Sequence, residues 1–284
     1  MQTLKDLAVL CTSTCTSKDG STEISGITLQ SAAVQPGDMF AALPGLHVHG
    51  AHFVEDACQR GASAVLTDPE GARIVASTGV NNIPLLVVDD IRAVLGRVSA
   101  AIYGNPSYDV PVIGITGTSG KTTTSYLIES AFRTAGHSVG MIGTTGSRIN
   151  GVRVPSSLTT PEAPDLQRLF ATMRDDGVHR IVMEVSSHSL LLGRVGGTRF
   201  RIGAFLNLSQ DHLDFHHTME EYFQAKARLF TKDSGTCCDR AVICIDDSWG
   251  LRMRDIAEAS GCTPVTVSTT GNACLLYTSP SPRD

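Results

Sequence analysis

The chain has 284 residues, of which 42% are hydrophobic and 18% are charged. This length suits one large domain or two of ordinary size, and the mixture is typical of a globular protein. The net charge of −5, from 23 basic and 28 acidic residues, argues against a nucleic-acid partner. Because no apolar run approaches the roughly 18 residues of a membrane span, we expect no membrane partner either.

The amino terminus and the cysteines both indicate a cytoplasmic protein. The first residues carry neither the basic nor the apolar region of an export signal. Cysteines show no CxxC spacing and no pairing with histidine, and they stand at positions 11, 15, 58, 237, 238, 244, 262 and 274. This pattern supports neither a zinc site nor a disulfide framework, so we interpret the cysteines as reduced thiols.

Residues 1–108 are predicted to form a first α/β domain. A turn at 35–38 leads into an apolar run at 39–43. Beyond this run, the apolar periodicity predicts a helix near 51–60, strands at 62–66 and 84–88, and a helix at 91–102. Turn-forming residues at 105–109 separate this block from the next one.

Residues 109–272 are predicted to form a second domain, in which strands and helices alternate. We predict strands at 110–116, 138–142, 181–185, 202–208, 241–245 and 264–267. Helices are predicted at 122–135, 164–176, 219–230 and 249–259. This alternation is typical of βαβ units, so the expected fold class is α/β with a mostly parallel sheet. Residues 273–284 are expected to be a polar tail.

A phosphate-binding loop is predicted directly after the strand at 110–116. Its residues are Gly117, Thr118, Ser119, Gly120, Lys121, Thr122 and Thr123. Backbone N–H groups of such a loop and the following helix N-terminus attract phosphate, Lys121 can reach the β- and γ-phosphates, and the Thr122 hydroxyl can ligate Mg²⁺. A ligand-free glycine-rich turn is the alternative, although it leaves the Lys-Thr pair at the helix start unexplained.

Polar residues also follow later strands, where open α/β sheets bind ligands. Glu184 and His212 could supply an oxygen and a nitrogen ligand to a divalent ion. In the alternative interpretation, Glu184 caps a neighbouring helix, and Asp211, His212 and Asp214 cap the helix predicted at Met219. Composition alone would make Lys226 a solvated helix lysine.

Four motifs, in order, resemble the Mur ligases. They are Gly117-Thr118-Ser119-Gly120-Lys121-Thr122-Thr123, Leu158-Thr159-Thr160-Pro161, Met183-Glu184-Val185-Ser186-Ser187-His188 and Asn207-Leu208-Ser209-Gln210-Asp211-His212-Leu213-Asp214. The resemblance covers residues 24–267 and is strongest to members that add a third residue to the peptidoglycan stem peptide. It implies a uridine-binding amino-terminal domain followed by a P-loop ATPase domain.

The resemblance also implies a reaction and its partners. The family uses ATP to phosphorylate a carboxylate of a UDP-N-acetylmuramoyl peptide, and the amine of an amino acid then attacks the acyl phosphate. For this chain, the implied substrates are UDP-N-acetylmuramoyl-L-Ala-D-Glu and meso-diaminopimelate, and we expect a monomer. Alternatives are an L-lysine-adding ligase, a ligase like folylpolyglutamate synthetase, and an inactive nucleotide-binding fragment.

Residue roles follow by match to the family motifs. The loop from Gly117 to Thr123 would hold ATP, and the implied catalytic residues are Lys121, Glu184, His212 and Lys226. The implied Mg²⁺ ligands are Thr122, Glu184, His212 and Lys226, the last as a lysine carbamylated by CO₂. Uridine contacts would be Leu29, Ser31, Leu46, His47 and Val48. Contacts to the muramoyl dipeptide would be Thr159, Thr160, Ser186 and Arg194.

The chain departs from the family pattern at three places. Gln30-Ser31-Ala32 stands where many relatives have Asp-Ser-Arg, and Leu192 stands where a glutamine contact is expected. The family has a further C-terminal domain that selects the amino acid. We therefore expect a truncated chain with a tail foreign to the family at 273–284. Such a chain alone would bind ATP or the UDP-sugar weakly and ligate nothing.

Overall fold

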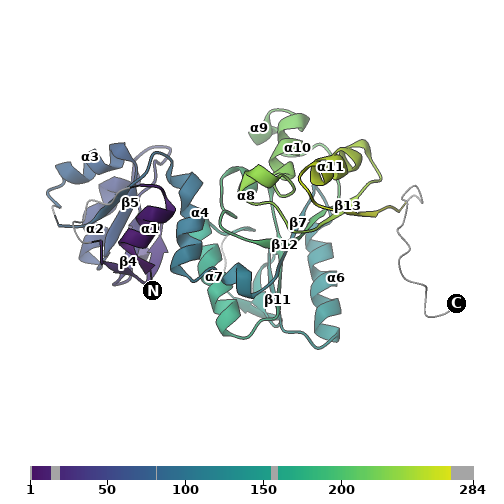
Figure 1. Ribbon diagram of the computed structural model, residues 1–284, viewed down its shortest axis with the longest axis horizontal. Helices are drawn as coiled ribbons and strands as arrows, with labels where there is room; N and C mark the ends of the chain where they lie inside the picture. Colours follow the sequence, from purple (N-terminus) through teal and green to yellow (C-terminus); the bar gives the residue numbers. More distant parts are fainter. Residues whose placement is uncertain (1, 14–19, 81, 155–158, 270–284) are drawn as a thin grey trace. The chain divides into compact units, whose positions relative to one another are not determined.

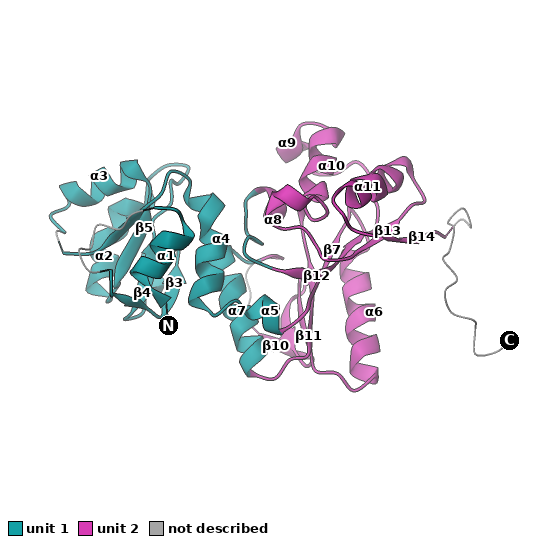
Figure 2. Cartoon of the chain, viewed as in Figure 1, with its two compact units in different colours: residues 1–109, 161–175, 192–198 teal, residues 110–160, 176–191, 199–284 magenta. Residues whose placement is uncertain are grey.

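The computed structural model describes residues 2–13, 20–80, 82–154 and 159–269. The expected tail at 273–284 lies outside these residues, as do Cys15, Leu158 and Cys274. The chain divides into two compact units (Figure 2), of which unit 1 comprises residues 1–109, 161–175 and 192–198 and unit 2 comprises the remainder. The domain boundaries at residues 108 and 272 stay predictions, since unit 1 also takes in two later segments.

Unit 1 is built on a four-stranded parallel sheet in the order β3-β4-β5-β6, of which β4 and β5 are labelled in Figure 1. The strands are β3 (Gly26–Thr28), β4 (Asp38–Ala41), β5 (Ala64–Thr67) and β6 (Leu85–Val87). Two short strands that precede β3 in the chain, β1 (Gln2–Thr3) and β2 (Glu23–Ile24), form a separate antiparallel pair. The helical segments of unit 1 are α1 (Leu4–Leu10), η1 (Ser31–Ala33), η2 (Gly50–Phe53), α2 (Val54–Gln59), α3 (Pro69–Ser77), α4 (Ile91–Ile102), α5 (Pro106–Asp109) and α7 (Ala163–Asp175).

The pleat of this sheet sends alternate side chains into two cores. Met39 and Leu66 pack in one core with residues of α1 and α4. Phe40 and Val65, their sequence neighbours, pack in the other core with residues of α2 and α3. Strands buried on both faces explain the continuous apolar runs of the sequence.

Unit 2 contains an eight-stranded sheet in the order β10-β9-β8-β11-β7-β12-β13-β14. Its strands are β7 (Val112–Thr116), β8 (Val139–Gly143), β9 (Gly146–Ile149), β10 (Val152–Val154), β11 (Arg180–Glu184), β12 (Phe200–Phe205), β13 (Ala241–Cys244) and β14 (Val265–Val267). The six strands from β8 to β14 in this order pair in parallel, and β9 and β10 add an antiparallel edge. The predicted α/β class with mostly parallel sheets is confirmed.

The helical segments of unit 2 follow these strands. They are α6 (Lys121–Thr134), α8 (Ser187–Leu191), α9 (Leu213–His216), α10 (Met219–Ala227), η3 (Lys232–Ser234) and α11 (Ser248–Ala259). Ile128 and Phe132 of α6 pack on Ile113, Ile115 and Val182 of the sheet. Within the described residues, none of these or the other helices has the length and apolar character needed to cross a bilayer.

The central strands β7 and β12 mark a topological switch. They are neighbours in the sheet, yet the chain leaves β7 toward β8 and leaves β12 toward β13, on the other side. Ligands of open α/β sheets bind outside the carboxyl ends of strands at such a point. The fold therefore places the loops after Thr116 and Phe205 where a ligand is expected.

Several predicted boundaries are wrong. The strand predicted at 202–208 is β12, which ends at Phe205, because the next residues bond to the phosphate loop, with Asn207 O accepting from Thr118 N at 3.1 Å. The helix predicted at 219–230 ends at Ala227, and the one near 51–60 divides into η2 and α2. The prediction omitted α3, although Asp68 caps it and Pro69 begins it, a common signature of a helix start.

Candidate functional site

The phosphate loop connects β7 to α6, as predicted. Gly120 is the N-cap of α6, with a φ of 85° that L side chains rarely adopt and no side chain to cap the helix. The first N–H groups of α6 are therefore available to a ligand, and the helix dipole favours an anion there. Gly117 is needed for another reason, since a Cβ on it would lie 3.0 Å from Leu206 Cβ.

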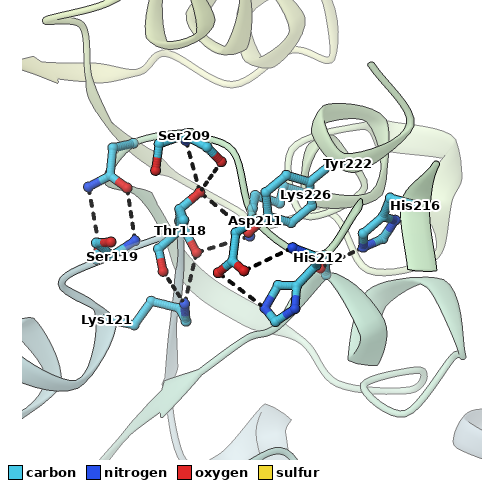
Figure 3. Close-up of polar contacts among 12 residues, drawn as sticks. Thr118, Ser119, Lys121, Ser209, Asp211, His212, His216, Tyr222 and Lys226 are labelled. Atoms are coloured by element: carbon cyan, nitrogen blue, oxygen red, sulfur yellow. Dashed lines mark hydrogen bonds and ion pairs between the residues drawn. The ribbon is translucent and has the colours of Figure 1, made fainter. Parts of the chain in front are cut away.

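The loop is held by the segment that follows β12. Ser119 N donates to Asn207 Oδ1 at 3.0 Å, and Asn207 Nδ2 donates back to Ser119 O at 3.1 Å. Thr118 Oγ1 accepts from Ser209 N at 3.0 Å and lies 3.3 Å from the hydroxyl of Tyr222 (Figure 3). Two segments distant in sequence, residues 207–209 and the start of α10, thus hold this loop.

Two lysines converge on the same loop. Lys121 Nζ donates to Gly117 O and to Thr118 O, both at 2.9 Å, and Lys226 Nζ donates to Gly117 O, also at 2.9 Å. Burial lowers the pKa of Lys121, while the charges of Glu184 and Asp211 act to raise it. Two amino groups therefore donate to a single carbonyl oxygen of this loop, that of Gly117.

Lys226 is not the solvated helix lysine that composition alone suggested. Only 1% of it is exposed, and its Nζ lies 4.3 Å from the ring centroid of Tyr222. Burial lowers its pKa to about 7, and the charge of Lys121 adds to this effect, whereas that of Asp211 opposes it. A substantial fraction of this amine is consequently unprotonated at neutral pH.

Glu184, at the end of β11, is 1% exposed, and both of its carboxylate oxygens accept hydrogen bonds. Thr122 Oγ1 donates to its carboxylate at 3.0 Å, and Thr144 donates to it from both N and Oγ1, also at 3.0 Å. Gly143 makes this arrangement possible, because a Cβ there would lie 2.2 Å from Glu184 Oε1. Glu184 does not cap a helix as the alternative supposed. Sequence reasoning missed Thr144, although it directly follows the strand β8.

His212 lies in a cluster of rings. It adopts a left-handed backbone with φ 52° and its ring centroid is 5.1 Å from that of His188 and 6.0 Å from that of Tyr222. Its Nε2 is 3.5 Å from Asp211 Oδ2. The alternative in which these residues cap α10 is wrong, because Thr218 is the N-cap and accepts from Glu221 N at 3.1 Å.

His216, at the end of α9, is buried. It is 2% exposed, and its Nε2 lies 2.8 Å from Ser187 Oγ. Burial lowers its pKa to about 4, and the charges of His188 and Lys226 contribute in the same direction. His216 therefore links α9 to α8 as a neutral ring at physiological pH.

The donor set near the loop fits Mg²⁺ bound together with phosphate. Among the described residues, no three His, Cys, Asp or Glu side chains are grouped as a protein-only metal site requires. Mg²⁺ usually takes one or two carboxylates and completes its shell with phosphate oxygens and water. Glu184 beside the Thr122 hydroxyl is such a pair of oxygen donors.

The residues predicted to bind the muramoyl dipeptide are divided between the units. Thr159, Thr160 and Ser186 belong to unit 2. Thr160 Oγ1 donates to Glu184 O at 3.1 Å, and Ser186 Oγ accepts from Ser189 N at 3.1 Å. In unit 1, Arg194 Nε lies 2.9 Å from Glu162 Oε1 in an ion pair.

The residues predicted to contact uridine all belong to unit 1. Leu29 and Ser31 follow β3 and are half-buried, whereas Leu46, His47 and Val48 are exposed on the loop after β4. Both segments therefore leave the carboxyl ends of neighbouring parallel strands.

Comparison with known proteins agrees with these motifs. Residues 115–280 match the model for the Mur ligase middle domain, and residues 23–103 match the model described as Mur ligase family, catalytic domain. The chain belongs to the Mur ligase family. It is 56% identical over 239 residues to the UDP-N-acetylmuramoyl-L-alanyl-D-glutamate--2,6-diaminopimelate ligase of Corynebacterium glutamicum, and 55% identical over 235 residues to that of Streptomyces coelicolor.

The alignments include most of this chain but less than half of each relative. The two alignments include 84% and 83% of this chain but 46% and 45% of the respective relatives. A solved structure of a ligase of the same name superposes with a TM-score of 0.76 at 30% identity, over 94% of this chain and 53% of the other. The chain thus spans about half the length of the curated relatives it matches.

Proposed function

We propose that this Mur ligase acts in the ATP-dependent addition of meso-diaminopimelate to UDP-N-acetylmuramoyl-L-Ala-D-Glu. The observation that carries the proposal is the phosphate loop with Lys121 on its carbonyls and the buried Glu184 on Thr122. Relatives at 56% and 55% identity are named for the diaminopimelate donor, which favours it over L-lysine. The described cysteines are free thiols, which suits the reducing cytoplasm.

We assign a different role to each group of residues in the site. The N–H groups at the start of α6 and the amino group of Lys121 hold the phosphates of ATP and neutralise their charge. Thr159, Thr160, Ser186 and Arg194 orient the dipeptide, whose carboxylate takes the γ-phosphoryl group of ATP and releases ADP. The amine of the donor then attacks the carbonyl carbon of this acyl phosphate, an amide bond forms, and phosphate leaves while the amine gives up a proton to water. Thr122, Glu184 and His212 would hold Mg²⁺, which supplies charge neutralisation between phosphate oxygens.

Lys226 is proposed to carry a carbamate. Its unprotonated Nζ attacks the carbon of CO₂, an N–C bond forms, one C–O π bond gives its electron pair to oxygen, and Nζ releases a proton to water. Burial supports this proposal because it lowers the pKa of the amine to about 7. The product would be an anionic oxygen ligand suited to Mg²⁺, next to the phosphate loop.

Ligation is tested by incubating the protein with ATP, Mg²⁺, UDP-N-acetylmuramoyl-L-Ala-D-Glu and either meso-diaminopimelate or L-lysine. Phosphate release and the mass of the UDP-linked product are measured, with Lys121→Ala as the inactive control. Product with diaminopimelate supports the proposal, and product only with lysine changes the donor. Nucleotide binding without product is the result expected if the chain is inactive by itself, whereas a protein that does not bind nucleotide either would contradict the proposed ATP site.

The carbamate is tested by ¹³C NMR of the protein in ¹³C-bicarbonate. We expect a carbamate carbon signal in the wild type that is missing in Lys226→Ala and unchanged in Lys232→Ala, which removes an exposed lysine. Identical spectra for the wild type and Lys226→Ala would exclude the modification.

A further inference from the structure

The loop between β4 and η2 is closed at its base and exposed at its tip. Gly50 N donates to Leu43 O at 2.8 Å, which brings the two ends of the loop together. Between them, Leu46 is 99% exposed and Val48 is 46% exposed. Large apolar side chains at an exposed tip receive no packing that would hold the loop in one conformation.

His49 connects this exposed tip to the body of unit 1. Its side chain is 8% exposed, its Nδ1 accepts from Ala51 N at 3.0 Å, and its Nε2 lies 3.2 Å from Asp68 Oδ1. Because Nδ1 accepts, the ring proton is on Nε2, which therefore donates to Asp68. Both ring nitrogens are engaged, so the orientation of His49 is determined.

Asp68 is itself held in place by α3. As the N-cap of this helix, its Oδ1 also accepts from Gly71 N at 2.7 Å. The first turn of α3 lies so near that a Cβ on Gly71 would be 2.6 Å from His49 Cε1. The imidazole is thus fixed between the end of the exposed loop and the start of a helix.

We infer that His49 and Asp68 are positioning residues, which hold Leu46, His47 and Val48 in the conformation that receives the uridine diphosphate group of the substrate. The inference rests on the proposed function, because the ligand of this loop follows from it. A loop that is ordered before binding loses less conformational entropy when the ligand arrives, and its affinity is higher. The hydrogen bond between His49 and Asp68 therefore affects affinity indirectly, by holding the residues of the neighbouring loop.

The experiment measures binding of UDP-N-acetylmuramoyl-L-Ala-D-Glu to the full chain by titration calorimetry, with thermal unfolding recorded for every variant. The test variants are His49→Ala, Asp68→Ala and the double variant. Asp68→Asn keeps an oxygen that accepts from both His49 and Gly71 and serves as the conservative rescue. Asp90→Ala is the matched control, because Asp90 caps α4 in the same unit through Ala93 N at 3.1 Å but contacts no loop residue of this group.

We expect His49→Ala and Asp68→Ala each to weaken binding about tenfold, the double variant to weaken it no further, and Asp68→Asn and Asp90→Ala to stay within about twofold. Wild-type affinity in His49→Ala and Asp68→Ala would overturn the inference and leave the proposed function standing. An equal loss in Asp90→Ala would also overturn it, since a general effect of helix capping would then explain the result. A wild type that binds no substrate would overturn both.

Discussion

Lys121 is the residue whose removal should affect nucleotide binding most directly. Its Nζ donates to two carbonyl oxygens of the phosphate loop, from where it can turn to a bound phosphate. We expect Lys121→Ala to weaken binding of ADP with Mg²⁺ by about tenfold or more, because a charge-assisted contact to phosphate is lost. Calorimetric titration measures this, and Lys232→Ala, an exposed lysine, should bind as the wild type does. Equal affinities would show that Lys121 does not contact the nucleotide.

Lys226 should make stability depend on pH. Its pKa falls from 10.5 to about 7 on folding, so between these values the unfolded chain binds the additional proton. Stability therefore rises as the pH increases through this window, and below about pH 7 the cost of burying the charge is fully present. In bicarbonate-free buffer, the free energy of unfolding of the wild type should gain roughly 2 kcal/mol from pH 7 to 9 relative to Lys226→Met. Urea unfolding at both pH values measures it, and parallel pH profiles would contradict the shift.

At the scale of elements, α10 determines where Lys226 lies. The helix is held at its start by Thr218, whose Oγ1 accepts from Glu221 N at 3.1 Å, and Tyr222 and Phe223 bury one face of it. Loss of a threonine N-cap typically costs about 1 kcal/mol. We expect Thr218→Ala to lower the free energy of unfolding by this amount in urea titrations. Thr263→Ala, at an exposed loop position, should change it by less than about 0.5 kcal/mol. Equal effects of the two substitutions would mean that the cap does not stabilise α10.

At the scale of the whole molecule, each unit has apolar clusters of its own. The apolar clusters on both faces of the four-stranded sheet contain residues of unit 1 alone, and the cluster under α6 contains residues of unit 2 alone. Trp249, the single tryptophan, is in α11 of unit 2. Its fluorescence therefore reports the unfolding of one unit, while far-ultraviolet circular dichroism reports both.

Leu66→Ala tests whether the two units unfold independently. Leu66 is fully buried in unit 1, and a leucine-to-alanine change in a core costs about 2–5 kcal/mol. We expect the unfolding transition seen by circular dichroism to move to lower urea, with a smaller shift in the transition seen by Trp249. Coincident shifts of the two signals would mean that the chain unfolds as one cooperative structure.

The sequence alone determined those features of the fold that depend on residues close together in the chain. The strand at 112–116, the glycines of the phosphate loop and the helix beginning at Lys121 follow from local pattern and backbone sterics, so they were predictable. Asp68 before Pro69 was an equally local signal for α3 that was not used. The hairpin of β9 and β10 has no apolar periodicity of its own, and only its pairing with β8 reveals it.

Only the tertiary structure decided which groups meet. Lys226 was indistinguishable from a solvated lysine, because its burial depends on Tyr222 above it and on a carbonyl 109 positions earlier in the chain. Thr144 reaches Glu184 because β8 and β11 are adjacent in the sheet although 40 residues separate the two side chains. Such contacts depend on strand order, which the sequence pattern leaves open because every buried strand has a similar apolar composition.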